Sequence, residues 1–111
     1  MNIEFSNEKN NLIMKIDGEI DHSYAVRIRN EADRKIVTYP DKHLIMDLSG
    51  VTFVDSSVIG AIIGRYKLVK SFGGNMAIVA SDSAVIKLLD MAGIRKIMPV
   101  YQTLADAIAG I

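Results

Sequence analysis

The sequence contains no cysteine, no tryptophan and no excess of charge of either sign. Without cysteine the chain can form neither disulfides nor the thiolate-ligated zinc and iron–sulfur sites of many small domains. Because 13 lysines and arginines are balanced by 13 aspartates and glutamates, nothing favours a nucleic-acid partner bound by neutralisation of its phosphates. Only four tyrosines and three phenylalanines are present, which disfavours an aromatic platform for bases or sugars.

Long hydrophobic runs are missing as well. The longest mostly apolar stretch, residues 56–64, has nine residues, whereas a membrane-spanning helix needs about 20. Residues 1–10 are polar and charged, unlike the apolar centre of a signal peptide. At 111 residues, half of them hydrophobic, the chain is expected to form one globular domain over residues 1–111. We therefore expect a cytoplasmic protein with no membrane partner, no metal and no cofactor.

Hydrophobic periodicity divides the chain into alternating strands and helices. The expected strands lie around residues 3–5 and over 12–16, 43–48, 51–54, 76–80 and 97–100, with turns at 6–11, 17–18 and 49–50. The expected helices cover 21–39, 57–72, 83–92 and 103–109. Because strands that alternate with helices are joined by crossovers, the pattern predicts an α/β fold: a mixed, mostly parallel sheet of four or five strands with about four helices.

A carboxylate and two hydroxyls, those of Asp55, Ser56 and Ser57, stand between an expected strand and the helix that follows. One interpretation is plain capping, in which one of these side chains accepts hydrogen bonds from free backbone N–H groups. The other is phosphorylation of one serine, because a helix N-terminus can accept a phosphate on the same N–H groups. A catalytic serine is disfavoured because the flanking glycines of a nucleophile elbow are missing.

The helix after these residues has glycines at positions 60 and 64, each costing up to about 1 kcal/mol relative to alanine. Ser56, Gly60 and Gly64 are spaced by four residues and therefore share one narrow face, with Ser57 at its edge. Two explanations remain open. The strip packs closely against a neighbouring helix of the same domain, or it is a flat docking surface for a partner protein.

Weaker candidates lie elsewhere in the chain. Asp47 is expected at a strand end, where the aspartyl-phosphate acceptor of a receiver-like domain would lie, but no acidic pair follows the first strand to hold Mg²⁺. A solvated strand end is therefore the simpler interpretation of Asp47.

Asp21 or Ser23 is expected to cap the first helix, with His22 exposed beside the cap. Arg65 is expected on a solvated helix face near the negative end of the helix dipole.

Four short segments carry a resemblance when they are taken together and in order. They read Gly-Glu-Ile-Asp-His at 18–22, Val-Asp-Ser-Ser at 54–57, Gly-Arg-Tyr-Lys at 64–67 and Leu-Asp-Met-Ala-Gly-Ile at 89–94. With this spacing along essentially the whole chain, the sequence resembles the anti-sigma factor antagonists of the STAS-domain superfamily, and in particular their sporulation branch.

The resemblance implies a regulatory protein rather than an enzyme. The unphosphorylated form would bind an anti-sigma factor that is also a serine kinase, and the sigma factor would be released. Phosphorylation by that kinase would end the interaction, and a serine phosphatase would restore the binding form. The alternatives are a STAS interaction module for another signalling partner, as in the general stress response, and the receiver-like domain phosphorylated on Asp47.

The resemblance also assigns residues. The phosphoacceptor maps to Ser57, and Ser56 is the competing candidate. Val58 stands where the family usually has glycine, which adds a β-branched side chain where the kinase would dock. The implied partner-binding residues are Asp21, Asp55, Ser56, Gly60 and Gly64.

Overall fold

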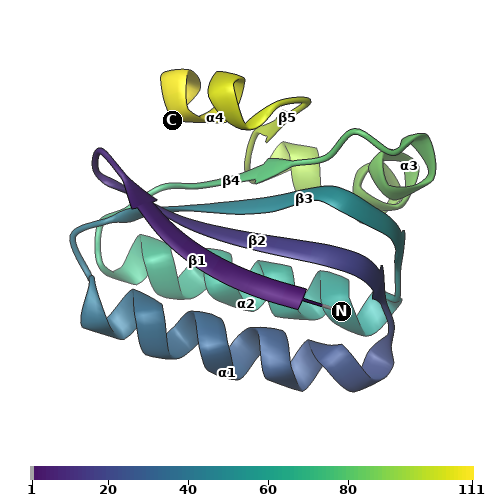
Figure 1. Cartoon of the computed structure of the whole chain (residues 1–111), viewed down its shortest axis with the longest axis horizontal. Helices are drawn as coiled ribbons and strands as arrows, with labels where there is room; N and C mark the ends of the chain where they lie inside the picture. The colour runs from purple at the N-terminus through teal and green to yellow at the C-terminus, as the bar shows by residue number, and fades with distance from the viewer. Residues whose placement is uncertain (1) are drawn as a thin grey trace.

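A computed structural model describes residues 2–111 as a five-stranded sheet with helices on both faces (Figure 1). The strands are ordered β1-β2-β3-β4-β5, and only the β1–β2 pair is antiparallel. The mixed, mostly parallel sheet with four α-helices is therefore confirmed for the described residues. The elements are β1 (Asn2–Glu8), β2 (Asn11–Ile20), α1 (His22–Thr38), β3 (His43–Val54), α2 (Ser56–Ser71), β4 (Met76–Val79), α3 (Ser83–Met91), the 3₁₀ turn η1 (Ile94–Lys96), β5 (Val100–Tyr101) and α4 (Leu104–Gly110).

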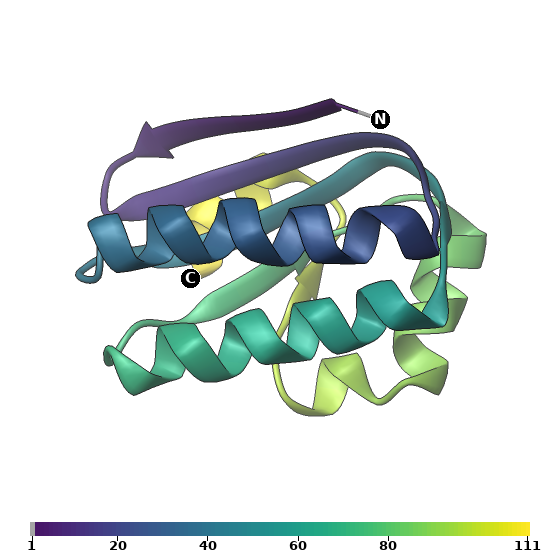
Figure 2. The same ribbon diagram turned by 90° about the horizontal axis from the view of Figure 1, so that it is seen from below.

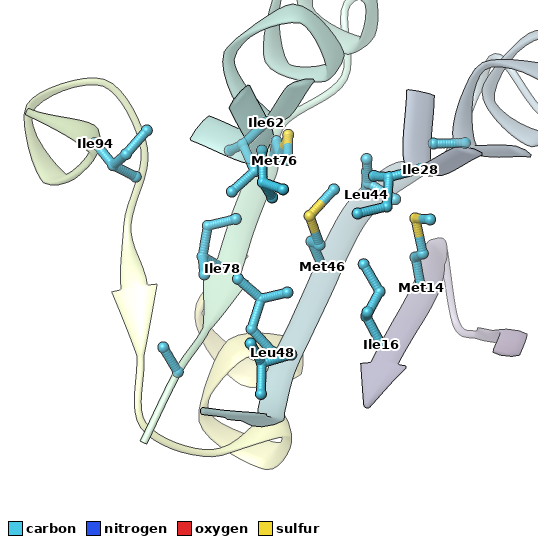
Figure 3. Packing of buried hydrophobic residues seen from close by; sticks show 14 of the residues in the cluster. Met14, Ile16, Ile28, Leu44, Met46, Leu48, Ile62, Met76, Ile78 and Ile94 are labelled. Atoms are coloured by element: carbon cyan, nitrogen blue, oxygen red, sulfur yellow. The ribbon is translucent and has the colours of Figure 1, made fainter. Parts of the chain in front are cut away.

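Helices α1 and α2 lie side by side on one face of the sheet, and α4 lies on the other (Figures 1 and 2). Strands β2, β3 and β4 are parallel neighbours in chain order, so successive right-handed crossovers place α1 and α2 on the same side. The main core lies between this face and the helices, as Figure 3 shows for strand residues such as Met46 and Ile78 with Ile28 of α1 and Ile62 of α2. Because both helices pack against the same face of the sheet, this core fixes the position of α1 relative to α2.

Two turns expected from the sequence are wrong, because residues 17–18 and 49–50 lie inside β2 and β3. Asp17 pairs with Gly50 across the two strands, next to irregularities in the β2–β3 register. A Cβ added at Gly50 would overlap Oδ1 of Asp17, so glycine leaves room for this side chain over β3. The strands continue as far as Ile20 and Val54, which also pair. Helices α1 and α2 therefore begin next to each other.

The C-terminal elements are shifted from their expected positions. The last strand occupies Val100–Tyr101 rather than 97–100, because Gly93, at φ 75°, leads into the turn η1. Helix α4 begins at Leu104, since Thr103 is its N-cap and accepts a hydrogen bond from the Asp106 backbone at 3.1 Å. Within residues 2–111 we find no helix that combines the length and the apolar character needed to cross a membrane.

Candidate functional site

Asp55 is the N-cap of α2, with an extended backbone at φ −78° and ψ 153°. Its Oδ1 atom accepts two hydrogen bonds from Ser57, one from the backbone N–H and one from the hydroxyl, both at 2.8 Å. The capping interpretation is therefore confirmed for Asp55. The same contacts hold the Ser57 hydroxyl, which is half-buried, whereas Ser56 is exposed.

The hydrogen bonds from Ser57 lower the pKa of the Asp55 carboxyl below its ordinary value. The backbone N–H makes the largest contribution and the hydroxyl the next, while desolvation opposes them and the positive charge of His22 adds to them. Each donor stabilises the ionised carboxylate more than the neutral acid. Asp55 is therefore an anion at neutral pH, directly beside the Ser57 hydroxyl.

The Asp55 cap predicts that the stability difference between the wild type and a variant without this carboxylate depends on pH. Because the folded-state pKa is depressed, the charge of Asp55 stabilises the fold above its unfolded pKa, and this contribution is lost as the pH falls through the folded pKa. We expect Asp55→Asn to lower the melting temperature at pH 7 but not at an acid pH below the depressed folded-state pKa, where the wild-type side chain is itself neutral. Thermal unfolding followed by circular dichroism between these pH values checks this. A constant difference across the range would contradict it.

The start of α1 repeats the arrangement at the start of α2. Asp21 is the N-cap, and its Oδ1 accepts hydrogen bonds from the Ser23 backbone at 2.9 Å and the Ser23 hydroxyl at 2.5 Å. The backbone N–H of Asp55 donates to the carbonyl of Ile20 at 3.0 Å. Asp21, rather than Ser23, is thus the cap, and this exposed carboxylate lies near the start of α2.

A groove runs between α1 and α2, which we call the α1–α2 groove. Its volume is about 450 Å³, and it is lined by His22, Ala25, Val26 and Arg29 of α1 and by Ser57, Gly60, Ala61, Gly64 and Arg65 of α2. A Cβ added at Gly60 or Gly64 would meet no atom within 4 Å. Close packing of these glycines against a neighbouring helix of the domain is therefore wrong. The strip borders open space instead.

The groove gathers some of the expected site residues and leaves others outside. Ser57, Gly60 and Gly64 line it, and Asp55 holds Ser57 at one end. Ser56 is exposed and does not belong to the lining. Val58 is fully buried in the core, so its bulk does not project into the groove, contrary to the expectation for this position.

The α1 wall of the groove was not anticipated from the sequence. Positions 22, 25, 26 and 29 share one face at helical spacing, and Val26 is 52% exposed on that face. Val26, an apolar residue outside the core-facing series of Ile28, Ala32 and Ile36, was a usable signal in the sequence. Which element lies opposite the stripe could not be deduced, because this depends on how α1 packs beside α2.

Arg65 lies between the two helices rather than on a solvated face, so that expectation is wrong. It is 7% exposed, and its Nε lies 2.7 Å from Oδ1 of Asp33 on α1. Burial lowers the pKa of Arg65, and the nearby charge of Arg29 lowers it further, while Asp33 opposes the shift. The guanidinium is therefore a partly paired cation at the α1–α2 contact.

Asp47 is not at a strand end. It lies inside β3, is 4% exposed, and accepts a hydrogen bond from the Ser49 backbone at 2.9 Å. The solvated strand end is thus wrong, and a buried side chain is inaccessible to the phosphodonor of a receiver domain. Over the part of the chain that the structure describes, no group of three or more His, Asp or Glu residues is arranged to hold a metal ion.

Comparison with known proteins adds independent findings. A family model described as the STAS domain matches residues 2–107. The chain is 37% identical over 108 residues to the anti-sigma F factor antagonist of Paenibacillus polymyxa, covering 97% of this chain and 92% of that protein. It is 28% identical over 102 residues to the anti-sigma-B factor antagonist of Bacillus subtilis (strain 168), covering 90% of each.

Solved structures share the fold. The anti-sigma factor antagonist SpoIIAA in its unphosphorylated form superposes with a TM-score of 0.75 at 19% identity, covering 99% of this chain and 100% of the other. SpoIIAA from Bacillus in its phosphorylated form gives a TM-score of 0.75 at 20% identity, covering 97% of both chains. Because the family model matches nearly the whole chain and the Paenibacillus polymyxa relative is 37% identical, this chain belongs to the STAS-domain family, and within it to the anti-sigma factor antagonists.

Proposed function

We propose that the unphosphorylated chain binds an anti-sigma factor that is also a serine kinase, causing release of the sigma factor, and that phosphorylation of Ser57 ends this binding. A serine phosphatase would restore the binding form. The observation that carries the proposal is the position of Ser57 at the end of a groove whose floor is kept open by Gly60 and Gly64. The names of the two similar proteins, both antagonists of anti-sigma factors, support the same role.

The chemistry of the site favours a switch in binding rather than in folding. A phosphoserine carries a charge of about −1.5 to −2 at pH 7, and no charged residue lies between positions 56 and 64. Phosphorylation would remove the Ser57 proton that is donated to Asp55 and would place a dianion beside this carboxylate. A partner seated on the groove would then have to desolvate an unpaired charge, which is costly.

Ser57 is preferred over Ser56 as the acceptor because of where the two side chains lie. The Ser57 hydroxyl lines the α1–α2 groove and has a defined orientation through its hydrogen bond to Asp55. Ser56 is exposed outside the groove. A phosphate on Ser56 would therefore remain solvated and disturb a partner in the groove less.

Phosphorylation can be tested directly with a kinase assay. We would incubate the chain with ATP and the anti-sigma F factor of Paenibacillus polymyxa, and then locate the modification by tandem mass spectrometry. We expect one phosphate on Ser57, none on the Ser57→Ala variant, and unchanged labelling of the matched control Ser56→Ala. Phosphate on residue 56 would refute the Ser57 assignment, and neither complex nor phosphate would refute the proposal for this partner.

A second candidate keeps the mechanism but changes the partner. The similarity to the anti-sigma-B factor antagonist of Bacillus subtilis supports a role in the general stress response instead. Dissociation constants measured for both anti-sigma factors would separate the two, because the true partner should bind at least tenfold more tightly. Tighter binding to the anti-sigma-B factor would replace the first candidate with the second.

A further inference from the structure

The lining of the α1–α2 groove carries positive but no negative charge. Arg29 and Arg65 supply the positive charge, and the lining contains no aspartate or glutamate. Arg29 is exposed and forms no ion pair within 4.0 Å to any of residues 2–111. The Arg29 and Arg65 charges are close enough for Arg29 to lower the Arg65 pKa. One end of the groove therefore carries the Arg29 charge, which has no ion-pair partner among residues 2–111, next to the Arg65–Asp33 ion pair.

Arg65 is under-satisfied at this end of the groove. Its side chain is 9% exposed, and the 2.7 Å contact with Asp33 lacks hydrogen-bond geometry. Both Nε and Nη1 consequently have no hydrogen-bond acceptor among residues 2–111. Both nitrogens are themselves buried. Since a guanidinium has five N–H donors and a buried unpaired donor is destabilising, a rotation of the Arg65 side chain that brings these donors to an anion in the groove would be favourable.

We propose that the Arg29–Arg65 end of the groove binds an aspartate or glutamate side chain of the anti-sigma factor, an inference that rests on the proposed function. A carboxylate matches the fork of a guanidinium and accepts charge-assisted hydrogen bonds from it. The partner segment that presents the carboxylate lies over Gly60 and Gly64, where the absence of side chains lets its backbone approach α2. The charge of the groove thus selects an acidic segment.

The carboxylate site is separate from the phosphorylation site. Ser57 and Gly64 are seven residues apart, which corresponds to about 10 Å along the helix axis, and Arg65 lies one residue further on. This separation is about one Debye length at 0.1 M salt. Salt therefore weakens, without abolishing, the electrostatic coupling between the two ends. We assign them different roles: Ser57 controls whether binding is permitted, and Arg29 with Arg65 contributes affinity and selects acidic partners.

The test measures dissociation constants by isothermal titration calorimetry with the anti-sigma F factor of Paenibacillus polymyxa. Arg29 is changed rather than Arg65, since Arg65 also contacts Asp33 within the fold. We expect Arg29→Gln to weaken binding about tenfold and Arg29→Glu about 100-fold. The Arg29→Gln variant should also lose less affinity than the wild type when NaCl is raised from about 50 to about 300 mM, because screening then acts on fewer charge pairs.

Arg34→Glu is the matched control. Arg34 is exposed on the same helix outside the groove lining, so the substitution makes the same change in net charge and should leave the dissociation constant within about twofold. Wild-type affinity in Arg29→Glu, or equal losses in Arg29→Glu and Arg34→Glu, would overturn the carboxylate site and leave the proposed function standing. Failure of the wild type itself to bind the anti-sigma factor would instead refute the proposed function, and the carboxylate site that rests on it.

Discussion

Replacing Ser57 by aspartate is expected to weaken binding to the anti-sigma factor by about 100-fold or more, equivalent to about 3 kcal/mol. The new carboxylate would face Asp55, which is already ionised, and would lie at the end of the α1–α2 groove. A partner would have to bury this second negative charge without a counter-ion. Titration calorimetry with the anti-sigma F factor of Paenibacillus polymyxa measures the loss.

The fold should survive this substitution. An acidic side chain in the first turn of a helix interacts favourably with the helix dipole, and Ser57 is only half-buried. We therefore expect the melting temperature of Ser57→Asp to stay within a few degrees of the wild type. Ser57→Ala should bind like the wild type and remain bound after incubation with ATP, because it offers no acceptor hydroxyl.

Ser56→Asp is the informative control for the charge at position 57. It adds the same charge one residue earlier, on an exposed side chain outside the groove. We expect this variant to lose less than tenfold in affinity, since an exposed charge remains solvated and screened. If Ser56→Asp and Ser57→Asp weakened binding equally, the position of Ser57 in the groove would not be the cause.

The double variant Gly60→Ala/Gly64→Ala should change stability and binding in opposite directions. Added methyl groups meet no atom within 4 Å at either position, so the higher helix propensity of alanine should raise the free energy of unfolding by about 1–2 kcal/mol in total. The same methyl groups project into the groove. We expect them to weaken the anti-sigma factor complex by about ten- to hundredfold, as overpacking of a close contact does.

Chemical denaturation and titration calorimetry on the same samples check both effects. Lys67→Ala serves as the control, because Lys67 is exposed on α2 away from the groove lining; its binding should stay unchanged. A double glycine variant that is more stable and still binds normally would show that no partner reaches the strip. A loss of stability would show that the space around the glycines is not open.

The glycines therefore represent a local conflict between folding and binding. Each lowers the stability of α2, yet neither is required by a positive φ angle or by a close neighbour within the domain. Departures from good local sequence choice are expected at functional sites, where they are offset elsewhere in the fold. Here the buried face of α2, with Val58, Ile62 and Val69 in the core, keeps the helix in place.

The sequence by itself determined the alternation of strands and helices, the presence of a capping side chain at the start of α1 and α2, and the face of α2 that carries the strip. Alternating strand and helix periods are local properties, as is the preference of Asp55 for an N-cap, so they could be predicted from neighbouring residues. The spacing of Ser56, Gly60 and Gly64 likewise follows from the geometry of one helix. These local rules explain why the mixed sheet and a cap at the start of α2 were predicted correctly, whereas the structure decided that Asp55 is the capping residue.

Only the tertiary structure decided what lies opposite that strip and which polar residues are buried. The continuous β2 and β3 strands bring the starts of α1 and α2 together, and this creates the groove with Arg29 on its far wall. Arg65 and Asp47 were misplaced because their burial depends on a neighbouring helix and on strand length, respectively. Such contacts join residues far apart in the chain, and no local pattern records them.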